Sequence, residues 1–167
     1  MTRTKVFLCS LFVILCSLFP LSAQTAAELD TLLETETVTV STAAHFAFGA
    51  AGLLTELSGP AAETLAYEQA LSRGWVKSGP EETITLKETA FLLMNVFELP
   101  GGLMYSIFRN PRYAYREMVY RKLIQGRTDE NMNVSGIKLL QIIGSTLNYT
   151  GEREEMDAML TINWGLE

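Results

Sequence analysis

Three segments of the chain share one pattern of apolar and polar positions. They align without gaps over residues 38–53, 84–99 and 132–147. Each segment opens with an apolar, a polar and an apolar residue, as a short extended stretch does, and then carries apolar or small residues three and four positions apart. We therefore expect each segment to lead into a helix that buries one face.

The polar residue of each opening is suited to cap the helix that follows. Thr39, Thr85 and Asn133 occupy this position, and their side-chain oxygens can accept a hydrogen bond from a free amide of the first turn. Glu88 follows Thr85 by three residues, which predicts a capping box. The pattern therefore predicts helix starts directly after residues 39, 85 and 133.

A second match precedes two of these helices. Residues 66–77 and 114–125 align, and each begins 18 residues before its capped helix. Both end in an apolar pair, Trp75-Val76 or Leu123-Ile124, followed by turn residues. The expected unit is a helix, a loop, a short extended stretch and a capped helix, and a period near 50 residues is typical of such repeats. The repeat cores are 29–53, 62–99 and 112–147, followed by a C-terminal tail, 148–167.

The first 23 residues have the order of a secretory signal peptide. Arg3 and Lys5 precede the apolar run Val6–Phe19, and Ser22 and Ala23 follow it; a basic start, an apolar centre and a small-residue exit describe such a signal. The run is shorter than the roughly 20 residues that span a bilayer. We expect cleavage after Ala23, and export to the periplasm, the cell envelope or the cell surface.

Both cysteines, Cys9 and Cys16, lie within this predicted signal. Cleavage after Ala23 leaves a domain, residues 24–167, without a disulfide or a thiolate metal site. The alternative is lipidation at Cys16, but Leu15 stands directly before it, where a small residue is usual.

The repeat pattern resembles the S-layer homology (SLH) family. The match is carried by Gly74-Trp75-Val76, by Ile84-Thr85-Leu86-Lys87-Glu88 and, in the third unit, by Lys122–Gly126. It extends from Leu29 to Thr150. The resemblance implies a mainly α fold, in which three helix-loop-helix repeats pack as a pseudo-threefold helical bundle. It also implies non-covalent anchoring to anionic cell-envelope polysaccharide, without a cofactor.

The chain departs from the family at the arginine that contacts the acidic sugar. The equivalent positions are Val40, Leu86 and Val134, all apolar, and Lys87 stands one residue late in one unit. The resemblance therefore supports the scaffold more than the usual ligand chemistry.

Charge is distributed unevenly along the chain. With 13 Lys and Arg against 19 Asp and Glu, the net charge is -6, and removal of the signal leaves 11 cations and a charge of -8. This acidity argues against a nucleic-acid-binding protein, which is usually basic. Six of the 11 cations nevertheless lie within Arg109–Arg127, where Glu117 is the only acid and three tyrosines are interleaved.

Three interpretations of this basic segment stay open. It is a solvated helix face, a site where arginine grips an anionic ligand and tyrosine stacks on a sugar, or a contact with an anionic membrane or a protein. The apolar stretch 103–108 precedes it, between Pro100-Gly101-Gly102 and Asn110-Pro111, and either plugs an end of the bundle or forms an exposed contact. The candidate ligand contacts are Arg109, Arg112, Tyr113, Tyr115, Arg116 and Lys87.

No pattern typical of catalysis is present. His45 is the only histidine, and its place in the first capped helix favours a packing role over a catalytic or metal-binding one. We expect an exported, non-enzymatic module that binds or scaffolds at the bacterial cell envelope through an anionic glycan. The alternative is a protein-interaction subunit of an envelope complex that uses residues 103–108 and 109–127.

Overall fold

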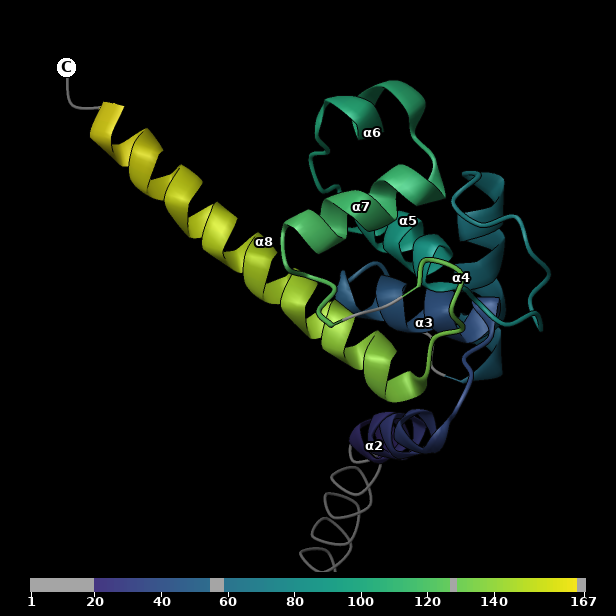
Figure 1. The fold of residues 1–167 in the computed structure, drawn as a ribbon. Helices are drawn as coiled ribbons and strands as arrows, with labels where there is room; N and C mark the ends of the chain where they lie inside the picture. Colours follow the sequence, from purple (N-terminus) through teal and green to yellow (C-terminus); the bar gives the residue numbers. More distant parts are fainter. Residues whose placement is uncertain (1–19, 55–58, 127–128, 165–167) are drawn as a thin grey trace, which may run out of the picture.

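The computed structural model describes residues 20–54, 59–126 and 129–164, and it is mainly helical (Figure 1). The helices are α2 (Pro20–Glu34), α3 (Val40–Ala50), α4 (Pro60–Ser72), α5 (Leu86–Val96), α6 (Leu103–Phe108), α7 (Pro111–Tyr120) and α8 (Gly136–Trp164). Residues 1–19 of the predicted signal peptide lie outside the described residues, and the predicted cleavage after Ala23 falls within α2.

Three extended segments meet at the centre of the molecule and are joined by a closed cycle of backbone hydrogen bonds. The Val38 amide donates to the Val134 carbonyl at 2.8 Å, Val134 donates to Ile84 at 3.2 Å, and Ile84 donates to Val38 at 3.0 Å. All three residues are buried. These bonds satisfy buried backbone groups that would otherwise be costly, and they place the starts of α3, α5 and α8 side by side.

The helices are arranged around these starts. Helices α3, α5 and α8 contact one another, and each also packs against one outer helix: α4 on α3, α7 on α5 and α2 on α8. The pairing of α2 with the start of α8 brings the first and the last helix of the described chain together (Figure 1). The prediction of a mainly α-helical bundle is confirmed, whereas its composition from three equivalent repeats stays a prediction. The predicted tail continues α8 as far as Trp164 and extends away from the bundle (Figure 1).

The apolar spacing predicts the buried face of one capped helix correctly, since Leu92, Val96 and Leu99 are buried. The faces predicted for the other two are wrong, since Leu53 and Leu147 are exposed and neighbouring faces of α3 and α8 enter the core. Its largest fully buried side chains come from the ends and inner faces of the contacting helices. They include Phe48 of α3, Leu92 and Leu93 of α5, Met118 of α7 and Leu139 of α8. Burial of side chains of this size is the main favourable contribution to folding.

Two of the three predicted helix caps are confirmed. Thr39 accepts a hydrogen bond from the Thr42 amide at 3.3 Å, and α3 begins directly after it. Thr85 forms the predicted capping box, in which its own amide donates to the Glu88 carboxylate at 3.0 Å. These contacts satisfy amides that have no partner within the first helical turn.

The third predicted cap, Asn133, is wrong. Helix α8 begins at Gly136, and the Lys138 amide donates to the Ser135 hydroxyl at 3.3 Å, so Ser135 is the cap. In the hydrogen-bond cycle the residue equivalent to Ile84 is Val134, which lies 50 residues later. The gapless alignment instead places Met132 opposite Ile84, 48 residues later. Two additional residues in the loop before α8 account for the shift.

This shift also moves the position equivalent to Val40 and Leu86 from Val134 to Gly136. A Cβ atom on Gly136 would lie only 1.7 Å from the Leu32 carbonyl oxygen of α2. Glycine therefore allows a close approach of α2 to α8, in which the Gly136 amide donates to the Thr35 carbonyl at 2.9 Å.

Candidate functional site

The apolar stretch 103–108 forms α6, a short helix that one residue fixes to the bundle. Tyr105 is buried, and its ring packs edge-on against Phe91 with centroids 6.3 Å apart. Gly101 leaves room for that ring, since a Cβ there would lie 2.1 Å from Tyr105 Cδ1. Burial raises the pKa of the Tyr105 phenol, while Arg109 and a hydrogen bond with Asn95 act in the opposite direction.

The other side of α6 is apolar and exposed. Leu103, Met104, Ile107 and Phe108 keep between 55% and 75% of their surface accessible, and we call these four residues the α6 tip. The helix packs against α7 and stands at the edge of the bundle (Figure 1). Of the two roles left open by the sequence, the exposed contact fits this arrangement, because a plug would be buried.

Helix α7 continues from the tip and carries arginines on its outer side. Asn110 caps it by accepting from the Tyr113 amide at 3.1 Å, and the Tyr113 ring stacks on Phe108 with centroids 5.3 Å apart. Arg112 and Arg116, one turn apart, are exposed, whereas Ala114 on the inner face is buried. The stacked rings therefore place the first turn of α7 directly beside the tip.

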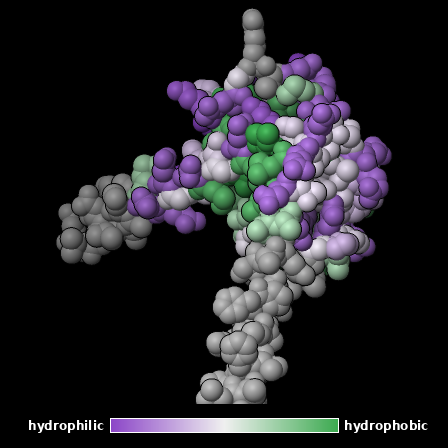
Figure 2. Space-filling model, turned by 90° about the horizontal axis from the view of Figure 1, so that it is seen from below, coloured by the Kyte–Doolittle hydropathy of each residue, from purple (hydrophilic) through white to green (hydrophobic). Residues whose placement is uncertain are grey.

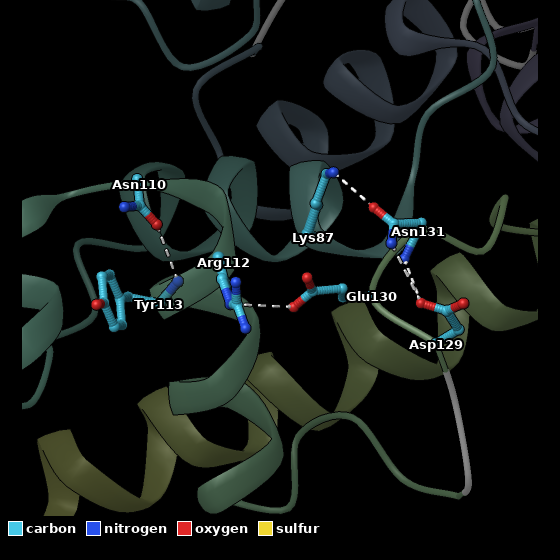
Figure 3. Close-up of polar contacts among 7 residues, drawn as sticks. All are labelled: Lys87, Asn110, Arg112, Tyr113, Asp129, Glu130 and Asn131. Atoms are coloured by element: carbon cyan, nitrogen blue, oxygen red, sulfur yellow. Dashed lines mark hydrogen bonds and ion pairs between the residues drawn. The ribbon is translucent and has the colours of Figure 1, made fainter.

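Lys87 and Arg112 reach the same turn from different helices. Figure 3 shows Lys87 of α5 donating from Nζ to Asn131 Oδ1 at 2.6 Å, and Arg112 of α7 approaching Glu130 Oε2 at 3.9 Å. The Arg112 side chain is 70% exposed, so this ion pair is long, solvated and of little energetic weight. Lys87 is engaged within the protein, whereas Arg112 is available to a ligand.

Arg121 is a structural residue and not part of the outer surface. Its guanidinium donates to Glu117 Oε1 at 2.8 Å, to the Tyr149 hydroxyl at 2.5 Å and to the Pro100 carbonyl. It also lies 5.2 Å from the Tyr149 ring centroid. These contacts tie α7 to α8 and to the end of α5, and they neutralise the one acid of the basic segment.

The remaining candidates lie in different surroundings. Arg109 follows α6 in a left-handed conformation (φ 37°) and is exposed. It lines a cavity of about 520 Å³ between the end of α5 and α6, together with Trp75, Glu98 and Ser106. Tyr115 is half-buried and packs against the core. The structure thus places Arg109, Arg112, Tyr113 and Arg116 close together in the chain, on α7 and on the turn that precedes it. Lys87 reaches the turn that Arg112 contacts but comes from α5, and Tyr115 is half-buried.

A second cavity, of about 390 Å³, lies between α2, α3 and α4. Its two carboxylates are occupied by the protein: Glu63 accepts from the Ser41 and Thr42 hydroxyls at 2.8 and 2.7 Å, and Glu28 accepts from the Gly59 amide at 3.0 Å. His45 Nε2 lies 3.6 Å from Glu28. These contacts hold the three helices together, and within the described residues no three His, Cys, Asp or Glu side chains are grouped to bind a metal ion.

Comparisons with family models, curated proteins and solved structures found no match to this chain. The resemblance to the SLH family stays a prediction that rests on the motifs. Across the described part of the chain, no helix is long and apolar enough to cross a membrane.

Proposed function

We propose that this protein is an exported, non-catalytic module with an SLH-like scaffold that binds the bacterial cell envelope through one surface. This α6–α7 surface consists of the α6 tip together with Arg109, Arg112 and Arg116. The observation that carries the proposal is the joint exposure of apolar and cationic side chains on adjacent elements. Among the described residues, no carboxylate lies within ion-pair distance of Arg109 or Arg116.

The location of these arginines fits the departure from the family motif. Where an SLH unit would present arginine, this chain has Val40, Leu86 and Gly136, all buried. An anionic ligand therefore has little to bind at the starts of α3, α5 and α8. The exposed cations of α7 offer the charge that those positions lack.

Another apolar region lies on a different face, but its charge is unsuitable for an anionic envelope. Figure 2 shows apolar side chains gathered at the centre of the face seen from below, where α2 lies. Leu29 and Leu33 of α2 are exposed. The neighbouring charges on α2 are Glu28, Asp30 and Glu34, and α2 contains no cation. Anionic polymers and lipids would be repelled there, whereas the α6–α7 surface would attract them.

Sedimentation of the purified protein with isolated cell envelopes tests the proposal. The double variant R112A/R116A should lose most of its retention at low salt, because both side chains are exposed and charge-assisted contacts account for binding. The matched control is K77A/R153A, which removes the same charge from other parts of the chain and should be retained like the wild type. Circular dichroism checks that both variants are folded.

Two results would contradict the proposal. One is wild-type retention of the folded R112A/R116A protein. The other is an equal loss in both double variants, which would indicate a dependence on net charge without a defined surface. Failure of the wild-type protein itself to sediment with envelopes would remove the proposed function altogether.

A further inference from the structure

The α6 tip is shaped as an apolar projection and not as a groove. Its four side chains occupy positions 103, 104, 107 and 108 of a single short helix, and each is more than half exposed. Tyr105 holds the opposite side of the helix in the bundle. A contiguous group of exposed large apolar residues marks a contact surface. Because this group projects from the bundle, it suits a deformable partner that can surround it.

Cations flank this projection closely. Arg109 is the next residue after α6, and the stacking of Phe108 on Tyr113 keeps Arg112 beside the tip. Arg116 lies one turn further along α7 and, four residues beyond it, Tyr120 is 83% exposed. An apolar tip flanked by arginines matches the surface of an anionic bilayer, in which hydrocarbon lies beneath a layer of negatively charged headgroups.

We infer that the α6–α7 surface docks on an anionic lipid bilayer, with the α6 tip inserted below the headgroups and Arg109, Arg112 and Arg116 binding lipid phosphates. This inference rests on the proposed function and names the envelope component that the surface contacts. Attachment through this surface is peripheral, because a six-residue helix is too short to cross the hydrocarbon core and enters only the headgroup boundary. The long arginine side chains can place their apolar stems in the interface while their guanidinium groups stay with the headgroups.

A bilayer fits this surface better than an acidic glycan or a protein does. A glycan offers acidic groups to the arginines but leaves Leu103, Met104 and Ile107 in water. A protein partner would need both a cavity for the tip and acidic residues around it. An anionic bilayer supplies hydrocarbon and negative charge together without any matched shape.

Co-sedimentation of the purified protein with vesicles tests this inference. We expect binding to vesicles of phosphatidylcholine with phosphatidylglycerol and little binding to phosphatidylcholine alone. R112A/R116A should weaken the binding about 25-fold at low salt, since each cation near an anionic surface contributes about a factor of five. L103S/I107S should weaken it by roughly 100-fold, because two apolar insertions are lost. High salt should reduce wild-type binding, because it screens the charges.

The matched control for the tip is L29S/L33S, which makes the same chemical change in the exposed leucines of α2 and should leave vesicle binding unchanged. K77A/R153A is again the control for the arginine change. Equal binding to neutral and anionic vesicles, or vesicle binding that survives in the folded L103S/I107S protein, would overturn the inference.

The experiment separates failure of the inference from failure of the proposed function. Retention on intact envelopes without vesicle binding would overturn the bilayer assignment and leave envelope binding intact. Undiminished retention on delipidated envelopes would assign the contact to a glycan or a protein. Recovery of a stoichiometric protein partner from those envelopes would select the protein. Each of these results contradicts the inference, whereas loss of retention on delipidation supports it.

Discussion

Replacement of Gly136 by alanine should separate α2 from α8 and destabilise the protein. The new Cβ would lie 1.7 Å from the Leu32 carbonyl oxygen and 2.6 Å from its carbon, distances that real atoms do not reach. Leu32 lies within α2 and is itself buried, so its backbone cannot turn away locally. The whole of α2 must therefore shift, which would strain or break the hydrogen bond from the Gly136 amide to the Thr35 carbonyl at 2.9 Å.

The magnitude follows from these two effects. Forcing extra volume into a packed contact costs about 1–3 kcal/mol, and loss of a buried hydrogen bond adds about 1 kcal/mol. We expect G136A to lower the free energy of unfolding by about 2–4 kcal/mol, a large part of the roughly 5–15 kcal/mol that stabilises a domain. Urea unfolding followed by circular dichroism measures this difference.

Gly144 in the same helix provides the matched control. A Cβ there meets no atom within 4 Å, and alanine is favoured over glycine in a helix interior by about 1 kcal/mol. G144A should therefore raise the unfolding free energy while G136A lowers it. A G136A protein as stable as the wild type would refute the close approach of α2 to the start of α8.

The remaining predictions concern single positions. Lys122 has a positive φ of 61°, so K122G should stabilise the protein by about 1 kcal/mol in urea unfolding; a loss of stability would contradict the left-handed backbone there. R121A should destabilise the protein by about 3 kcal/mol, because it leaves the half-buried Glu117 unpaired. R116A should change the stability by less than about 0.5 kcal/mol. Equal effects of the two variants in thermal denaturation would contradict the structural role of Arg121. S135A should lower the free energy of unfolding by about 1 kcal/mol, because a helix cap is lost, and N133A should lower it by less. A larger loss for N133A in urea unfolding would show that Asn133 is the cap, as the gapless alignment predicts.

Local patterns predicted much of the fold. The alternation around Val38 and Ile84 and the hydroxyls of Thr39 and Thr85 act within a few residues of each other, so the sequence alone indicates extended segments followed by capped helices. The third segment was misplaced because Met132-Asn133-Val134 and Val134-Ser135-Gly136 both follow the same apolar, polar, apolar or small order. The choice between them depends on backbone partners in distant segments, which no local pattern contains.

The sequence alone names residues for the candidate site but does not indicate how they are arranged. Arg112, Arg116 and Arg121 are alike in sequence, yet Arg121 is withdrawn from the surface by Tyr149, 28 residues away. The exposure of the α6 tip likewise depends on tertiary packing, since Tyr105 alone finds a partner in Phe91. The turn residues Pro100-Gly101-Gly102 and Asn110-Pro111 indicate the limits of α6 in the sequence. No local pattern indicates which face of this helix is covered.

We propose that the α6 tip is the part of the protein that meets the envelope. Cys9 and Cys16 both precede residue 24, so a single cysteine introduced into a protein of residues 24–167 can carry an environment-sensitive fluorophore. We expect a blue shift of the emission when isolated envelopes are added to the labelled Ile107→Cys protein, and no shift for the labelled Leu29→Cys protein. A shift at position 29 without one at position 107 would contradict this proposal.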